Sequence, residues 1–295
     1  MPRLPAPVER WLPTPLLRAS ALVHLAALAC VAAAPRRWRW ALAAAAADQL
    51  VLFAASLAPR SGLVGPLVAR LPAASAARGE VALTFDDGPD PQATPQVLDL
   101  LDAAGARASF FMIGRRAAAH RGLVAEVARR GHRVENHTWG HGWGFAWRGP
   151  SGMGREVDRA QRLLTGLAGR PPGWFRPPAG MRSPWLAGVL AGRGLALASW
   201  SRRGFDTVDH RPRRVLRRLT RGLAGGDVLV LHDGSSPRLD GADGGANDAA
   251  GGQPLILELL PPLLDALARR GLTAVALPDP PAARDGRPAN RRARR

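Results

Sequence analysis

The stretch Val81-Ala82-Leu83-Thr84-Phe85-Asp86-Asp87-Gly88-Pro89 is an apolar run that closes on two adjacent carboxylates. Its β-branched, aliphatic and aromatic residues are typical of a buried strand, and the Gly-Pro pair marks a turn. The sequence therefore predicts a strand over residues 81–85 with two acidic groups at its C-terminal end.

Beyond this strand, short apolar runs alternate with segments of helical period. Further strands are predicted at 108–113, 132–136, 174–176, 195–200, 228–231 and 273–277, and helices at 94–104, 123–130, 155–167, 185–191, 212–223 and 255–269. Seven strands alternating with helices indicate parallel β/α winding. In a barrel of this kind, the functional residues gather at the C-terminal ends of the strands.

The informative polar residues follow these strand ends repeatedly. Asp86 and Asp87 end the first strand and His137 follows the third, while Arg176 ends the fourth. Asp206 lies after the fifth strand, and His232-Asp233 ends the sixth. Polar residues scattered at random through a core would not all follow the C-terminal ends of strands. We therefore expect a functional site at this edge of the sheet.

Asp87, His137 and His141 form a set of one oxygen and two nitrogen ligands for a divalent metal. Such a set leaves coordination positions open for water and substrate, as a catalytic zinc site requires. We expect the two histidines to reach one ion from a single helical turn, because side chains four residues apart point the same way. Two surface histidines are the alternative.

The neighbouring residues suggest an acid and a base. Asp86 points away from Asp87, because consecutive strand residues diverge, and it is a candidate general base oriented by Arg176. His232 is the candidate general acid, because histidine titrates near neutrality. Asp206 is its candidate partner and, with Asp86, His232 and Arg176, the fourth candidate catalytic residue. An ordinary loop carboxylate is the alternative for Asp206. Asp233 is the alternative partner, or a helix cap.

Four tryptophans are candidates for a surface that stacks on sugars: Trp139, Trp143, Trp147 and Trp200. Core or surface packing explains each of them equally well.

With these residues in place, residues 81–277 resemble the polysaccharide deacetylase family, the NodB-homology domain of carbohydrate esterase family 4. Five motifs match in order: TFDDGP at 84–89, HTWGH at 137–141, RPPAG at 176–180, the region 200–206, and VLVLHD at 228–233. The resemblance implies an α/β fold, a distorted (β/α)7 barrel. It also implies a Zn²⁺ or Co²⁺ ion on Asp87, His137 and His141.

The resemblance further implies Asp86 as base, His232 as acid, and hydrolysis of N- or O-acetyl groups on a carbohydrate. The chain would be a hydrolase of carbon–nitrogen bonds other than peptide bonds. Two departures concern the substrate: Thr207 stands where the family often has Trp, and Val230 where it has Leu. A hydrolase of a small linear or cyclic amide is the alternative, and a non-catalytic envelope-binding protein is a third.

The N-terminal region differs from the rest of the chain. Residues 16–34 and 40–58 are apolar and Ala-rich, and the Arg/Trp cluster at 35–39 separates them. We expect a membrane hairpin over 1–60, a linker at 61–77 and the deacetylase-like domain at 78–279. A signal peptide cleaved near 32–34, a lipid-modified Cys30, or two helices packed on the soluble domain are alternatives.

Arg36, Arg37 and Arg39 favour a cytoplasmic loop, and hence a bacterial inner-membrane protein whose catalytic domain faces the periplasm. The partners would be an acetylated glycan and the membrane. The formal charge of +18 comes from arginines scattered along the chain without a basic-aromatic motif, so no nucleic-acid partner is expected. The single cysteine excludes an internal disulfide. An exposed loop is predicted at 234–252 and a disordered Arg-rich tail at 280–295.

Overall fold

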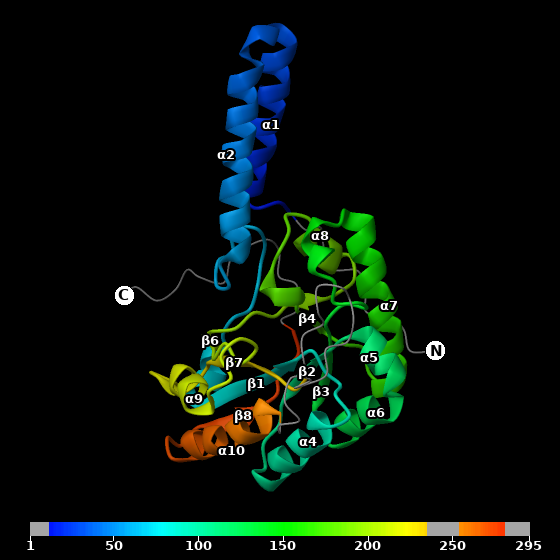
Figure 1. Cartoon of the computed structure of the whole chain (residues 1–295), viewed down its shortest axis with the longest axis vertical. Helices are drawn as coiled ribbons and strands as arrows, with labels where there is room; N and C mark the ends of the chain where they lie inside the picture. The colour runs from blue at the N-terminus through cyan, green and yellow to red at the C-terminus, as the bar shows by residue number, and fades with distance from the viewer. Residues whose placement is uncertain (1–11, 235–253, 281–295) are drawn as a thin grey trace.

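The computed structural model of the chain describes residues 12–234 and 254–280, and it consists of an α/β domain and a projecting helical hairpin (Figure 1). The loop predicted at 234–252, apart from Gly234, and the tail beyond Pro280 lie outside the described residues.

A sheet of eight parallel strands forms the centre of the domain. The strands are β1 (Glu80–Asp86), β2 (Ser109–Met112), β3 (Arg133–Asn136), β4 (Trp174–Phe175), β5 (Ala196–Leu197), β6 (Arg202–Arg203), β7 (Val228–His232) and β8 (Thr273–Val275). Their order is β5-β4-β3-β2-β1-β7-β6, and β8 pairs with one end of β1. β1 is therefore central, and it is fully buried beyond Glu80.

The fold class predicted from the sequence is confirmed, with two differences in detail. Among the described residues β5 and β6, the two ends of the sheet, do not pair with each other. Residues 68–71 instead connect β5 to the chain before β7: the Val68 N–H donates to the Leu197 carbonyl oxygen and the Leu71 N–H to that of Gly226, both at 2.9 Å. Strand β6 was also not predicted, because its Arg202-Arg203 pair carries no apolar strand signal. Backbone pairing with β7 alone makes these two residues a strand.

Helices form a layer over the outer face of this sheet, in which α9 packs on α10, α10 on α4, and α6 on α7 (Figure 1). They are α3 (Ala73–Ala77), α4 (Ala93–Ala103), α5 (Gly114–Ala119), α6 (Arg121–Arg129), α7 (Pro150–Ala168), α8 (Leu186–Ala191), α9 (Pro212–Thr220) and α10 (Leu255–Ala268). Their apolar faces bury one main core against β1, β2 and β7. The short helices α3 and α5 were not predicted.

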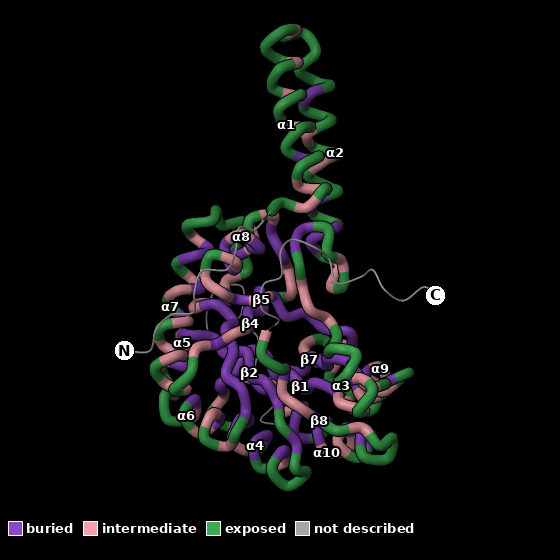
Figure 2. The backbone as a smooth tube through the Cα atoms, turned by 180° about the vertical axis from the view of Figure 1, so that it is seen from behind, coloured by how far each residue is buried: buried purple, intermediate pink, exposed green. Residues whose placement is uncertain are grey.

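The first two helices, α1 (Pro15–Ala33) and α2 (Trp38–Leu57), form an antiparallel hairpin that projects from the domain (Figure 2). A 3₁₀ turn, η1 (Pro35–Arg37), joins them. Most of their large apolar side chains are exposed, so the helices do not pack along the soluble domain, which was one of the three alternatives. Both are long and apolar enough to cross a membrane by length and composition.

Polar side chains connect the two helices inside this apolar hairpin. The Ser20 hydroxyl donates to Asp48 at 2.6 Å, and the His24 ring nitrogen Nδ1 lies 2.9 Å from the carbonyl oxygen of Ser20. The Gln49 amide contacts the other ring nitrogen of His24 at 3.2 Å. Such hydrogen bonds hold helices together where no water competes for the polar groups.

Arg182 fixes the foot of the hairpin to the domain. Its guanidinium donates to the carbonyl oxygens of Ala55, Ala58 and Ser61, at 2.9, 2.7 and 2.6 Å. Because the last carbonyls of a helix lack partners within the helix, this buried cation caps the C-terminus of α2. Burial lowers the pKa of Arg182. The three carbonyl oxygens give acceptors to the N–H groups of the buried guanidinium.

Candidate active site

The central pair of strands brings the two predicted acid–base residues side by side. β1 and β7 are parallel neighbours, and their register places Asp86 opposite His232. Both residues end their strands, so their side chains emerge at the same edge of the sheet. These two residues, selected because each follows a strand, therefore lie together at one edge of the sheet.

Asp86 is held by an ion pair with Arg176. The guanidinium Nη1 lies 2.6 Å from the Asp86 carboxylate and donates also to the hydroxyl of Thr84 at 2.9 Å. Nη2 donates to the carbonyl oxygen of Ser199 at 3.1 Å. These bonds fix the orientation of the carboxylate, since each donor has a buried acceptor.

Arg176 is entirely buried, with its guanidinium 4.1 Å from the centroid of the Phe111 ring. Burial lowers the pKa of Arg176, and the Asp86 carboxylate opposes this shift. A buried pair of this kind is sensitive to loss of either partner, because the remaining charge has no water around it.

Asp87, His137 and His141 converge on one point. Asp87 Oδ1 lies 3.3 Å from His137 Nε2 and 3.1 Å from His141 Nε2, and all three side chains are buried. Among the described residues, one ligand atom from each can lie within 4.8 Å of the others, as a single metal site requires.

The backbone that carries the two histidines differs from the prediction. Residues 137–141 form a loop after β3 and not a helical turn. The left-handed conformations of Thr138 (φ 68°) and His141 (φ 51°) bend this loop so that the two rings lie 4.6 Å apart. Spacing of four residues was therefore the correct signal, but the helical geometry inferred from it was wrong.

The protonation of this cluster fits a cation. His137 Nδ1 donates to the carbonyl oxygen of Arg176 at 2.7 Å, because a carbonyl can only accept, and its other ring nitrogen, Nε2, is the one that faces Asp87. Burial lowers the pKa of His141 to about 4, so this ring is neutral at pH 7. Burial alone would disfavour the Asp87 charge. In the acid range where this carboxyl titrates, however, His141 is cationic, and its charge together with the hydrogen bond to His137 holds the pKa of Asp87 well below its usual range. Three lone-pair donors that face one another are the donor set of a Zn²⁺ site.

Two further residues, which were not predicted from the sequence, support the cluster. Arg116 Nη1 donates to the backbone carbonyl of Asp87 at 2.6 Å. Asn136 accepts from the backbone N–H of Thr138 at 3.0 Å and donates to Gln161, which fixes the start of the histidine loop. Arg116 follows the end of β2 at the same edge of the sheet, so the strand-end argument could have found it.

His232 and Asp206 also lie together. Asp206 Oδ1 lies 3.0 Å from His232 Nδ1, and its Oδ2 accepts from the His232 backbone N–H at 2.9 Å. Burial opposes a charge on His232, but the Asp206 carboxylate outweighs it and raises the pKa of His232 to about 9. The alternative partner, Asp233, turns away and accepts a hydrogen bond from the Thr94 hydroxyl at 2.6 Å.

The four tryptophans do not form one surface. Trp143 and Trp147 lie on the 3₁₀ helix η2 (Trp143–Trp147) and are 50% and 70% exposed. Trp139 is covered by the Arg159 guanidinium, whose carbon lies 3.7 Å from the centroid of the Trp139 ring. Trp200 is buried beneath the foot of the hairpin. The first two remain available to stack on a sugar.

Known proteins share this arrangement of strands and motifs. The profile of the polysaccharide deacetylase family matches residues 73–196. A chitooligosaccharide deacetylase of Azorhizobium caulinodans is 30% identical over 204 residues, which cover 68% of this chain and 94% of that protein. The chain belongs to the polysaccharide deacetylase family. A peptidoglycan-N-acetylglucosamine deacetylase of Bacillus cereus is 33% identical over 160 residues, 54% of this chain and 74% of that protein.

A solved structure of the family agrees with the fold. The family 4 carbohydrate esterase of Streptomyces lividans, determined in complex with acetate, has a TM-score of 0.57 and 30% identity, covering 66% of this chain and 91% of that one. The matched part of this chain has the size of its α/β domain, because two thirds of this chain matches nearly all of the esterase. Membership in the family confirms the resemblance inferred from the five motifs.

Proposed function

We propose that the chain is a metal-dependent hydrolase that removes acetyl groups from a carbohydrate polymer or oligomer. The observation that carries the proposal is the convergence of three units at one sheet edge: the Asp86–Arg176 pair, the Asp87/His137/His141 cluster and the His232–Asp206 pair. Together they provide a base, a metal site and an acid, as hydrolysis of an unactivated amide requires. The deacetylase names of the two relatives support this reading.

Asp87, His137 and His141 would hold the ion, and Zn²⁺ suits their donor set best. When bound, a divalent ion supplies Lewis acidity, which polarises the acetyl carbonyl and acidifies water. Asp86 takes the proton from the attacking water. Arg176 keeps the Asp86 carboxylate in one orientation, because it contacts that oxygen at 2.6 Å.

His232 supplies the proton that the departing sugar nitrogen or oxygen needs. Its raised pKa keeps the ring protonated at neutral pH, so the proton is available before the bond breaks. Asp206 holds Nδ1, which leaves Nε2 as the nitrogen that donates. Asp86 thus acts when water attacks and His232 acts when the sugar departs, and the two residues lie on adjacent strands.

We also propose that α1 and α2 insert into a membrane, with the Arg36, Arg37 and Arg39 loop on the cytoplasmic side and the catalytic domain on the opposite side. The exposed apolar surface of both helices supports insertion. With Cys30 replaced by Ser, a cysteine at Arg37 should react with a membrane-impermeant maleimide only after permeabilisation. A cysteine at the exposed His210 should react in cells whose outer barrier alone is opened. The reverse pattern would invert the topology.

The decisive experiment measures acetate release by the full chain from acetylated chitooligosaccharides, peptidoglycan and xylan. The protein is chelated first and then supplied with Zn²⁺ or Co²⁺, and the Asp86→Asn variant serves as the inactive control. Metal-dependent release that this variant lacks supports the proposal and ranks the glycans. Turnover of a small amide without any release from glycans would instead select the small-amide hydrolase, and bound metal without any turnover would select a binding protein.

A further inference from the structure

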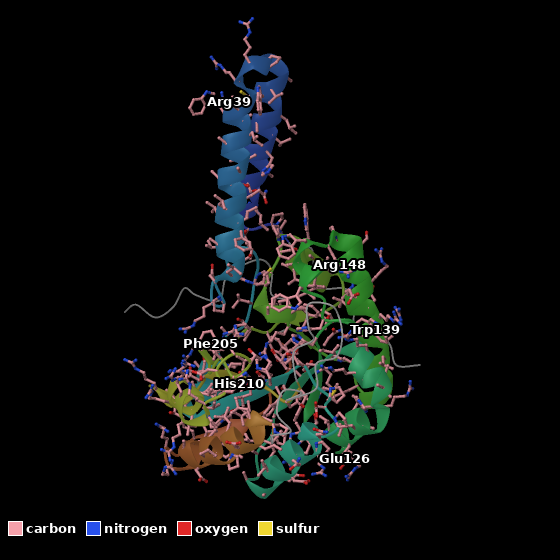
Figure 3. All side chains as sticks on the ribbon, viewed as in Figure 1. Arg39, Glu126, Trp139, Arg148, Phe205 and His210 are labelled. Atoms are coloured by element: carbon pink, nitrogen blue, oxygen red, sulfur yellow. The ribbon has the colours of Figure 1, made fainter. Side chains whose placement is uncertain are left out.

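A cavity of about 360 Å³ lies between the foot of the hairpin and the active-site loops. Leu57, Pro59 and Arg60 line it from the end of α2. From the catalytic domain it is lined by Ala179, Gly180, Trp200, Ser201, Arg203 and Phe205. Phe205 is seen below the hairpin foot in Figure 3.

The charge of this lining is positive. Arg60 and Arg203 are its two ionisable residues, and no lining residue is acidic. Within residues 12–234 and 254–280, neither arginine forms an ion pair, and the buried Nε of Arg203 has no hydrogen-bond partner. The preceding residue, Arg202, is by contrast neutralised by an ion pair with Asp227, whose Oδ2 lies 2.9 Å from the Arg202 Nε. Arg60 and Arg203 therefore bring to the cavity two positive charges that no carboxylate of the described residues neutralises, and an anion bound there would balance them.

Arg203 is also held in place. Its guanidinium carbon lies 5.4 Å from the Trp200 ring centroid and 5.0 Å from that of Phe205. Cation–π contacts with two rings restrict the guanidinium, whose fork of N–H donors suits a phosphate. The guanidinium is therefore positioned by aromatic rings and not by a carboxylate, which leaves its charge available.

The walls of the cavity are rigid. Arg182 and Ser199 bind the carbonyl oxygens of Ala58 and Pro59, so the end of α2 is fixed against the domain. Five described residues other than glycine have positive φ: Asp87, Thr138 and His141 at the metal cluster, and Ala179 and Phe205 on this cavity. Strained backbone of this kind persists where the surroundings enforce it, and it clusters at functional sites.

The cavity adjoins the catalytic residues. Trp200 lies 5.7 Å from the guanidinium carbon of Arg176, which in turn binds Asp86. Phe205 directly precedes Asp206, the partner of His232. The lining of the cavity is therefore joined to the proposed base through Arg176 and to the proposed acid through Asp206.

From these observations we infer that the cavity is a subsite for a phosphate ester of the acetylated sugar, bound between Arg60 and Arg203. The inference rests on the proposed deacetylase function and assigns its substrate class. Leu57 lines the cavity and also continues into the exposed apolar side of α2 with Phe53 and Leu50. A lipid chain esterified to the same phosphate would lie along that surface.

The experiment compares three probes with the full chain in detergent micelles. They are N-acetylglucosamine 1-phosphate, its decyl phosphodiester, and the neutral decyl N-acetylglucosaminide. Affinity is measured by calorimetry and acetate release by kcat/KM. We expect the phosphodiester to exceed the neutral glycoside by about tenfold or more in both, since hydrogen bonds to charged groups contribute this much. The preference should weaken as salt is raised.

Arg203→Gln and Arg60→Gln should each reduce the ratio of phosphodiester to neutral probe toward one. Arg162→Gln, an exposed arginine on α7, is the matched control and should keep the wild-type ratio. Arg60 is itself exposed, so its variant tests the subsite even where Arg203→Gln does not fold.

The outcomes separate the subsite from the reaction. Equal binding and turnover of charged and neutral probes overturns the phosphate subsite and leaves the deacetylase proposal standing. Phosphate-dependent binding that Arg203→Gln abolishes, without acetate release from any substrate, supports the subsite and overturns the deacetylase. Equal affinity for the two phosphate probes supports the subsite with a soluble sugar phosphate as ligand, and a higher affinity of the decyl ester supports a lipid-linked one.

Discussion

Asp206 binds His232 through both of its carboxylate oxygens, one at the backbone N–H at 2.9 Å and one at the ring nitrogen Nδ1 at 3.0 Å. The two contacts fix both the position of the residue and the orientation of its ring. The remaining nitrogen, Nε2, is therefore left to face the reacting group, and its acidity depends on Asp206.

Asp206→Asn should move the alkaline limb of the pH profile of kcat/KM to lower pH. Asp206 raises the pKa of His232 to about 9 from an ordinary 6.5, and activity needs the protonated ring, so the wild-type enzyme loses activity only as pH passes the raised value. The same shift stabilises the fold fully below pH 6.5, and this stabilisation is lost as pH rises toward 9. An alkaline limb unchanged in the variant would contradict the assignment of His232 as the acid.

Asp86→Asn should lower kcat by about 10²- to 10⁴-fold with little change in KM, because a positioned base contributes this much. Arg176→Gln should instead lower the free energy of unfolding by about 3–5 kcal/mol, since it leaves the Asp86 charge buried without a partner. The double variant should recover part of that loss, because neither charge remains. Urea denaturation measures the stabilities, and additive losses in the double variant would refute the coupling.

Asp87→Ala, His137→Ala and His141→Ala should each lose tightly bound Zn²⁺, because each removes one of three ligands. His210→Ala is the matched control, since His210 is exposed and distant from the cluster in sequence (Figure 3). Metal content after dialysis, measured by mass spectrometry, gives the stoichiometry independently of activity. Full zinc occupancy in any of the three ligand variants would exclude that residue from the site.

Arg182→Gln should loosen the foot of the hairpin, because three carbonyl oxygens at the end of α2 lose their cationic donor. Each charged hydrogen bond contributes about 1.5–3 kcal/mol, so local opening should become at least tenfold more frequent. Limited proteolysis at residues 58–63 measures the opening. The exposed Arg148 provides the control variant Arg148→Gln, and equal cleavage of the two variants would show that Arg182 does not hold the hairpin.

The edge of the sheet where the site lies was predictable from the sequence, because strand periodicity is a local property and the polar residues follow strand after strand. The short strand Arg202–Arg203 was not predictable, because nothing in its side chains distinguishes it from a loop. Its backbone pairs with β7 only once both are brought together by the fold.

The contacts within the site were predictable only in part. The spacing of His137 and His141 indicated a shared ion, but the left-handed residues that turn the rings toward Asp87 are set by tertiary packing. The choice between Asp206 and Asp233 as the neighbour of His232 likewise depends on side-chain direction. Thr94 draws Asp233 away, and that threonine is 139 residues distant in the chain.

The sequence by itself determined the β/α alternation, the apolar hairpin and the residue types of the site, because hydrophobic period and motif spacing act over short stretches of chain. Only the tertiary structure decided that Arg176 reaches Asp86, that Arg182 holds the foot of α2, and that Arg60 and Arg203 line one cavity. These pairs join residues up to 143 positions apart. Such contacts arise from the packing of whole elements, which no local pattern encodes.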